Sequence, residues 1–224
     1  MRVLFVIRAV EHYPYFRSIV EALLDRDHDV KILFDRDWSQ RGLDLVGIKL
    51  KGVSYGWTVP YLVRLRRIIF WIRDLLSYIR YLKVRGQSGF YKDRWRKVLF
   101  VPVQWFLKIP FVEFLLKTKV TGRVLAVLET VTGPVSEIVE DIRQFDPAVV
   151  VATPANMPHS SADLEYLKAA RALSIPTALP VFSWDNLTTK GLIHIKPKVL
   201  LAWNEKQVQE AWKHHGIAKR DIRI

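Results

Sequence analysis

The sequence of 224 residues contains no cysteine. This absence excludes a disulfide scaffold, a thiol nucleophile and a zinc or iron–sulfur site built on cysteine, and it fits a cytoplasmic location. The dinucleotide-binding pattern G-x-G-x-x-G, the P-loop and the zinc motif H-E-x-x-H are missing as well. The first apolar run, residues 3–7, is too short for the core of a signal peptide, so we expect a β-strand there.

Acidic residues are scarce in one part of the chain. Residues 57–123 contain fifteen basic residues and only three acidic ones, whereas the rest of the chain is close to neutral. Almost all of the net charge of +13 therefore lies in one stretch. We interpret this stretch as a basic insert in an otherwise ordinary globular protein. The chain has enough apolar residues for one large domain or two small ones.

On both sides of the insert, the apolar pattern alternates between strands and helices. The pattern predicts strands at 2–7, 30–34, 148–152, 177–181 and 199–203, and helices at 16–24, 135–145, 162–173 and 205–214. This alternation predicts an α/β fold, a Rossmann-like parallel sheet with helices on both faces, plus a basic amphipathic helical insert. Residues 219–224 resemble the start of another strand, so we expect the natural chain to continue past Ile224.

The insert combines two apolar segments with basic and aromatic residues. Residues 60–84 repeat apolar positions at helical spacing, and residues 98–116 are apolar enough that a membrane span must be considered. Two prolines and three polar residues within 98–116 favour a patch that lies on a membrane surface. The residues expected to contact an anionic membrane are Arg64, Arg67, Trp71, Arg73, Arg80, Lys83 and Trp105. Alternatively, the helices of the insert pack on the sheet or on each other and their arginines are solvated. The insert could also bind nucleic acid, but it is more apolar than a nucleic-acid groove requires.

Ligands of parallel α/β sheets bind beyond the carboxyl ends of the strands, which selects four loops. In the first of these loops, His12 is a candidate general base because histidine titrates near neutral pH. In the second, the D-x-D pattern of Asp35 and Asp37 is interpreted as a solvated turn, not a metal site. The candidate substrate-binding residues of the first, third and fourth loops are Arg8, Glu11, Tyr15, Arg17, Asn156, His159, Asp185, Asn186, Thr188 and Lys190.

The sequence resembles the N-terminal half of a GT-B glycosyltransferase. More closely, it is similar to bacterial surface-polysaccharide and UDP-N-acetylglucosamine 2-epimerase-like glycosyltransferases. The segments that carry the resemblance cover a little over half of the chain and are RVLFVIR, HYPYFRSIVEALLDRDHDV, IRQFDPAVVVATP, ALSIPTALPVFSWDNLTTKG and VLLAWNEKQVQEAWKHHGI. SWDNLTTKG and the block that follows it are the more specific of these.

The resemblance implies an acceptor-binding domain that faces a donor-binding domain across a cleft. It implies that His12 is the base, that a nucleotide sugar is the co-substrate, and that neither a metal nor another cofactor is needed. The donor-binding half is missing here, so we expect no catalysis from these residues alone. The resemblance implies a glycan or lipid-linked acceptor. Because the insert is basic and apolar, we expect a peripheral location at the inner face of the membrane, where a lipid-linked acceptor would lie. A C-terminal domain or a partner subunit would complete the site.

Three alternatives stay open from the sequence. A 2-epimerase or a glycerophosphotransferase could use the same fold, and the chain could be a non-catalytic module that binds a membrane surface. The sugar, the nucleotide and the acceptor are not specified by any motif.

Overall fold

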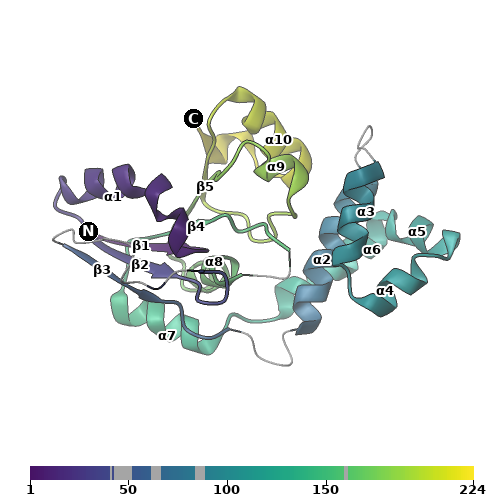
Figure 1. The fold of residues 1–224 in the computed structure, drawn as a ribbon, viewed down its shortest axis with the longest axis horizontal. Coiled ribbons are helices and arrows are strands. Elements are labelled where there is room, and N and C mark those ends of the chain that lie inside the picture. Colours follow the sequence, from purple (N-terminus) through teal and green to yellow (C-terminus); the bar gives the residue numbers. More distant parts are fainter. Residues whose placement is uncertain (41, 43–51, 62–66, 84–88, 159–160) are drawn as a thin grey trace.

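A computed structural model of the chain describes residues 1–40, 42, 52–61, 67–83, 89–158 and 161–224. Figure 1 shows a parallel β-sheet with its helices and, beside it, a separate group of helices. The strands are β1 (Arg2–Ile7), β2 (Asp29–Phe34), β3 (Val53–Trp57), β4 (Val149–Thr153), β5 (Thr177–Pro180), β6 (Val199–Leu201) and β7 (Ile222–Arg223). The helices of the sheet region are η1 (Val10–Tyr15), α1 (Arg17–Leu24), α7 (Ser136–Phe145), α8 (Ala162–Ala172), α9 (Asn186–Thr189), α10 (Glu205–His215) and η4 (Lys219–Asp221).

The seven strands form one sheet in the order β3-β2-β1-β4-β5-β6-β7, and every neighbouring pair is parallel. The predicted α/β class is confirmed, and β7 confirms the strand expected near the end of the sequence. Strand β3 was not predicted, because Ser54 and Gly56 interrupt the continuous apolar run on which the other strands were predicted. Strand order reverses between β1 and β4, and such a switch point opens a crevice at the carboxyl ends of the two strands.

Helices cover both faces of the sheet. One face packs against η1 and α1 through a cluster that includes Phe5, Phe16 and Val20. The other face packs against α7 and α8 through a larger cluster that includes Ile138, Ile142 and Tyr166. The near-continuous apolar strands follow from this arrangement, since a sheet buried on both faces has no solvent side for polar residues.

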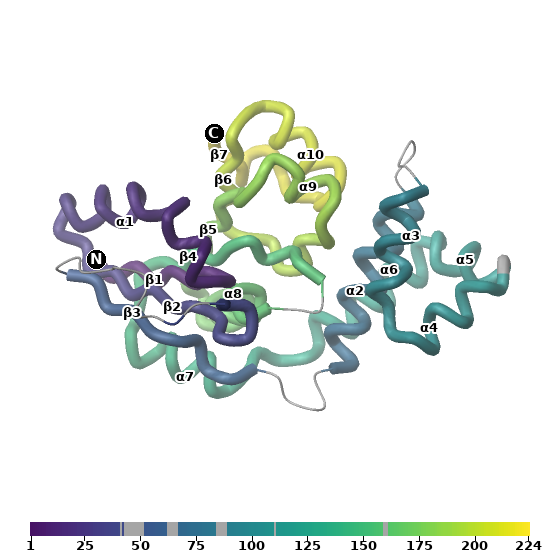
Figure 2. The backbone as a smooth tube through the Cα atoms, viewed as in Figure 1, coloured from purple at the N-terminus to yellow at the C-terminus, as the bar shows by residue number. Residues whose placement is uncertain are grey.

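The insert is a helical group with its own apolar core. It consists of α2 (Arg67–Lys83), α3 (Gly89–Val98), α4 (Val101–Phe106), α5 (Pro110–Leu116) and α6 (Lys119–Val131). Its core includes Tyr78, Trp95, Leu99, Leu107 and Leu116. In sequence the insert lies between β3 and α7, so it interrupts the sheet domain between β3 and β4 (Figure 2).

The apolar segment 98–116 is broken into short helices. Pro102 and Pro110 lie in the first turns of α4 and α5, where a missing N–H is tolerated. Among the described residues, no helix combines the length and the apolar character that crossing a bilayer requires.

Two arginines that the sequence placed on the membrane-facing side are instead inside the protein. Arg73 and Arg80 are only 2% and 7% exposed. They lie seven residues apart on α2, so two helical turns present them on the same face, towards α8 and the loop after β5. The predicted placement of these two arginines on an exposed, membrane-facing surface was wrong, because each side chain is buried against partners far away in the sequence.

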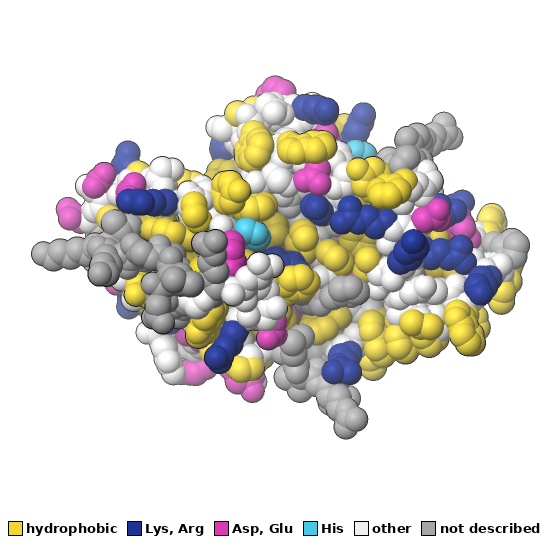
Figure 3. Space-filling view, viewed as in Figure 1, with side chains coloured by type: hydrophobic (Ala, Val, Ile, Leu, Met, Phe, Trp, Pro, Cys, Tyr) yellow, Lys and Arg dark blue, Asp and Glu magenta, His cyan; other side chains and the backbone are white. Residues whose placement is uncertain are grey.

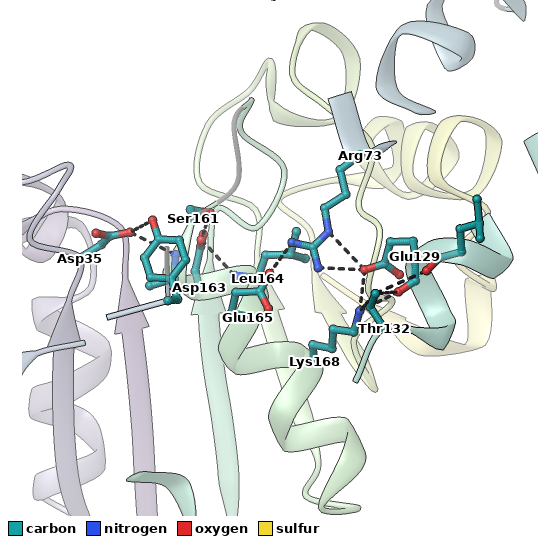
Figure 4. A network of polar contacts seen from close by, with 12 residues as sticks. Asp35, Arg73, Glu129, Thr132, Ser161, Asp163, Leu164, Glu165 and Lys168 are labelled. Atoms are coloured by element: carbon teal, nitrogen blue, oxygen red, sulfur yellow. Dashed lines mark hydrogen bonds and ion pairs between the residues drawn. The ribbon is translucent and has the colours of Figure 1, made fainter. Parts of the chain in front are cut away.

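The partners of Arg73 form a buried ionic network that joins the insert to the sheet domain (Figure 4). Arg73 binds Glu129 of α6 at 2.8 Å and also pairs with Glu165 of α8. Lys168 of α8 lies 3.0 Å from the same Glu129 carboxylate oxygen and donates to the Glu129 carbonyl at 2.7 Å. The network holds two cations and two carboxylates, so its formal charges balance.

Candidate functional site

A cavity of about 420 Å³ opens at the switch point of the sheet. Its walls come from the loops after β1, β2, β4 and β5, which is where ligands of parallel α/β sheets bind. Its lining residues include Arg8, Glu11, His12, Trp38, Gln40, Pro154, Met157, Phe182, Ser183, Asn186 and Lys190. Five of the predicted site residues therefore meet in one cavity.

Arg8 supplies a buried positive charge to this cavity. The side chain follows directly from β1, and its guanidinium carbon lies 3.5 Å from the centroid of the Trp38 ring. Both terminal nitrogens, Nη1 and Nη2, are buried and have no hydrogen-bond partner within the described residues. Burial lowers the pKa of Arg8, while the carboxylates of Asp163 and Asp35 raise it. Burying a guanidinium whose N–H donors have no hydrogen-bond partner costs free energy. This geometry therefore favours the binding of an anionic group.

His12 lies beside Arg8 and has the properties of a base. The η1 turn places its ring 4.4 Å from that of Phe182, between centroids. Its Nδ1 atom is buried and has no hydrogen-bond partner in the part of the chain described. Burial lowers the pKa of His12, and the Arg8 charge lowers it further. The imidazole is therefore neutral at pH 7 and can accept a proton.

The loop after β5 is held by its own polar side chains. Asn186 donates to Asn156 Oδ1 at 2.8 Å, and Asn156 donates to the Asn186 carbonyl at 2.7 Å. Asp185 accepts hydrogen bonds from Ser183 and Thr189, and its carboxylate lies 3.4 Å from Lys190 Nζ. Most polar atoms of SWDNLTTKG thus stabilise the loop, and Ser183, Asn186 and Lys190 are the members that line the cavity.

The insert clamps the same loop from outside. Arg80 donates to the carbonyls of Leu187 and Thr188 at 3.3 and 3.2 Å and also to that of Lys190. Tyr81 donates to the Thr188 carbonyl at 2.6 Å, and Trp95 to the Thr189 carbonyl at 3.1 Å. These contacts span more than ninety residues of sequence, so no local pattern reveals them. Through this clamp, the insert positions one wall of the cavity.

The remaining predicted residues lie around the cavity or outside it. Tyr15 is exposed and packs edge-on against Phe182, so it lies at the rim. Arg17 is exposed and pairs with Glu21 at 2.8 Å. The Thr188 hydroxyl bonds the Asp185 carbonyl at 3.2 Å. His159 and the membrane candidate Arg64 lie outside the described residues. Trp38 and Phe182 line the cavity but were missed, because no motif marks a lone aromatic residue in a loop.

The interpretation of Asp35 as part of a solvated turn was wrong. Its side chain is buried and accepts hydrogen bonds from the Tyr61 hydroxyl at 2.8 Å and from the Ala162 N–H at 3.1 Å. Burial raises the pKa of Asp35, and these hydrogen bonds oppose that effect. Asp35 therefore fixes the start of α8. Within the described residues, no group of three or more histidine, aspartate or glutamate side chains could hold a metal ion.

His215, at the end of α10, also holds the loop after β5 in place. Its Nδ1 accepts from the Ile193 N–H at 3.0 Å, and its Nε2 lies 2.9 Å from the Leu187 carbonyl. These contacts require the neutral tautomer with a proton on Nε2. Burial lowers the pKa of His215 to about 3, and the Arg80 charge contributes.

We expect acid to destabilise the protein through His215. Its pKa is about 6.5 when unfolded, so its contribution is complete above pH 6.5 and falls as the pH drops towards 3. In His215→Gln the amide can replace both hydrogen bonds without titrating. The loss of unfolding free energy between pH 7.5 and 4.5, measured with urea, should be about 2 to 3 kcal/mol smaller in the variant. An equal loss in both proteins would contradict this expectation, and His28→Gln is the matched control.

The strand order, the two covered faces and the cavity at the switch point define a Rossmann-like α/β domain with a ligand-binding crevice. Among solved structures, the chain is similar to the crystal structure of the glycosyltransferase VinC in complex with dTDP, with 15% identity and a TM-score of 0.37. The match covers 83% of this chain and 36% of that one, so the chain spans about a third of that protein's length. No protein-family model and no curated protein matches the chain.

Proposed function

We propose that the chain is the acceptor-side domain of a GT-B glycosyltransferase that moves a sugar from a nucleotide sugar to a lipid-linked glycan acceptor. The observation that carries this proposal is the meeting of His12 and Arg8 in one cavity at the switch point. Both residues have buried nitrogen atoms to which no described residue forms a hydrogen bond. A neutral base beside an unpaired cation suits a reaction between a hydroxyl group and a phosphorylated sugar.

In the proposed reaction, His12 and Arg8 have separate roles. His12 takes the proton of the acceptor hydroxyl, and the hydroxyl oxygen attacks the anomeric carbon of the sugar. The bond between that carbon and the diphosphate oxygen breaks, and the nucleoside diphosphate leaves with the electron pair. Arg8 would attract the negative charge of the diphosphate, and the low dielectric constant of the cavity would strengthen this attraction. Glu11 and Lys190 line the cavity and would orient sugar hydroxyl groups.

The insert supports a location at the membrane surface. Trp105, Phe111 and Phe114 on α4 and α5 are 63–70% exposed, and Val120, Val124, Val127 and Val131 form an exposed stripe on α6. Figure 3 shows apolar side chains gathered along the outer part of the insert. Soluble proteins rarely expose so many large apolar residues together, and interfacial helices do. Arg67, Trp71 and Lys83 are also exposed on α2, where they could meet anionic headgroups.

A transfer assay tests the proposed reaction. The protein, expressed as its gene encodes it, is incubated with radiolabelled nucleotide sugars and a lipid extract of the source membranes. We expect label in the lipid fraction and release of a nucleoside diphosphate in equal amount. An altered sugar nucleotide that forms without lipid would instead identify an epimerase, and transfer of a glycerol phosphate group would identify a glycerophosphotransferase.

No turnover of any donor would overturn the proposal of catalysis. It would favour the second candidate function, a non-catalytic module that binds membranes. The exposed apolar surface of α4–α6 is the observation that supports this candidate.

A further inference from the structure

A second cavity, of about 600 Å³, lies between α2, α6 and the end of α10. It is lined by five cationic side chains, Arg80, Lys83, Lys119, Arg123 and Lys213, and by one acidic side chain, Glu129. Glu129 already binds Arg73 and Lys168. Figure 3 shows Lys and Arg side chains gathered where the insert meets the sheet domain. The cavity therefore has a strong excess of positive charge with no acid left to balance it.

The cations of this cavity are available for a ligand. No carboxylate in the part of the chain described pairs with Lys119, Arg123 or Lys213, and Lys83 contacts only a carbonyl at 3.4 Å. Arg80 is buried, and its Nε atom has no hydrogen-bond partner among the residues described. Burial lowers the pKa of His194, His214 and His215, so the histidines of the cavity add no charge at pH 7. An anion is the ligand that these five side chains would bind.

Part of the cavity lining is apolar. Leu76, Ile79, Ala126 and Leu192 line it, and Gly122 leaves space beside Lys83. No Phe, Tyr or Trp side chain of the described residues lines the cavity, and these are the usual stacking surfaces for nucleic-acid bases. A lining that combines cationic and apolar side chains fits a ligand that carries both a charged head and an apolar part.

The α6 helix connects this cavity to the exposed apolar surface. Lys119 and Arg123 point into the cavity, whereas Val120 and Val124, one residue further along, lie on the exposed stripe. A lipid could thus place its headgroup in the cavity and its chains along the outside of α6. This continuity distinguishes a membrane lipid from a small soluble anion.

We propose that the cavity between α2, α6 and α10 binds the phosphorylated headgroup of a membrane lipid. This site is separate from the cavity of Arg8 and His12. The inference rests on the proposed membrane association and does not depend on the transfer reaction. Arg80 belongs both to this cavity and to the clamp on the loop after β5, so a bound headgroup would contact the residue that positions the wall of the other cavity.

Sedimentation with vesicles tests the site. We compare phosphatidylcholine vesicles with vesicles that also contain phosphatidic acid, using the triple variant Lys119→Gln, Arg123→Gln and Lys213→Gln. Each basic residue near an anionic surface contributes about 1 kcal/mol, so affinity for phosphatidic acid should fall on the order of 100-fold. A second triple variant, Arg143→Gln, Arg171→Gln and Lys198→Gln, removes the same charge from exposed positions outside the cavity and should change affinity only a few-fold.

Equal losses in the two triple variants would overturn the proposal, because they would indicate attraction without a site. Complete displacement of the protein from vesicles by micromolar glycerol phosphate would also overturn it, since the cavity would then bind a soluble phosphate tightly without the apolar part of a lipid. The single variant Lys213→Gln, at an exposed position, repeats the test if the triple variant does not fold. Replacing Trp105, Phe111 and Phe114 with serine should abolish binding to all vesicles. If binding persists, the apolar surface of α4 and α5 does not mediate membrane association. A wild-type protein that binds no vesicles would remove the membrane association itself, separately from the headgroup site.

Discussion

Glu129→Gln is expected to lower the free energy of unfolding by about 3 to 5 kcal/mol. The Glu129 carboxylate is buried and accepts from Arg73 Nη2 at 2.8 Å and from Lys168 Nζ at 3.0 Å. Burial raises the pKa of Glu129, but the charges of Arg73 and Lys168 outweigh burial and leave the pKa below its ordinary value. The amide keeps the shape of the side chain and removes its charge. Two buried cations would then share the single carboxylate of Glu165.

Chemical denaturation at pH 7 measures this loss. Glu140→Gln makes the same chemical change at an exposed position of α7 and should shift stability by no more than about 0.5 kcal/mol. A loss below about 1 kcal/mol in Glu129→Gln would mean that the network contributes little. The insert and the sheet domain would then be joined mainly by apolar contacts.

The second large effect is expected at His12. If His12 is the general base of sugar transfer, His12→Gln should lower kcat by about 10²- to 10⁴-fold, with a small change in KM. The wild-type rate should be constant above about pH 6.5 and fall in acid, because protonated His12 cannot accept a proton. Burial and Arg8 lower the pKa of His12, so this fall should lie below the usual value for histidine.

The pH profile separates catalysis from structure. In His12→Gln the remaining rate should lose the acid limb that His12 causes. A rate that falls with the acid limb unchanged would instead indicate that His12 only packs against Phe182. The control is His28→Gln, which lies just before β2, at the opposite edge of the sheet from the cavity, and should leave kcat unchanged.

The sequence predicted the parts of the fold that depend on local pattern. Apolar runs located five of the seven strands, and a sixth was expected at residues 219–224. The rule for parallel sheets brought Arg8, His12 and Lys190 to the correct edge. The sequence could not predict the burial of Arg73 or Arg80. An arginine beside an apolar stripe has the same pattern whether it meets water or a carboxylate 92 positions away, as Arg73 does.

The loop SWDNLTTKG also shows what the local sequence cannot predict. Its density of polar residues indicated a ligand site, and it does border the cavity. Most of those side chains, however, bond one another or the backbone, as Asp185 and Asn186 do. Composition reports that polar groups are concentrated in a loop. Only the fold decides whether their partners are a ligand or the protein itself.

The clamp of Arg80, Tyr81 and Trp95 on the loop after β5 has a consequence for modularity. The helical group looks like a cassette that could be grafted onto another Rossmann-like domain, because it enters and leaves between two strands. Its side chains nevertheless complete the backbone hydrogen bonding of residues 187–190. Insert and loop must therefore be exchanged together in any chimera, and substitutions in one constrain which substitutions the other tolerates.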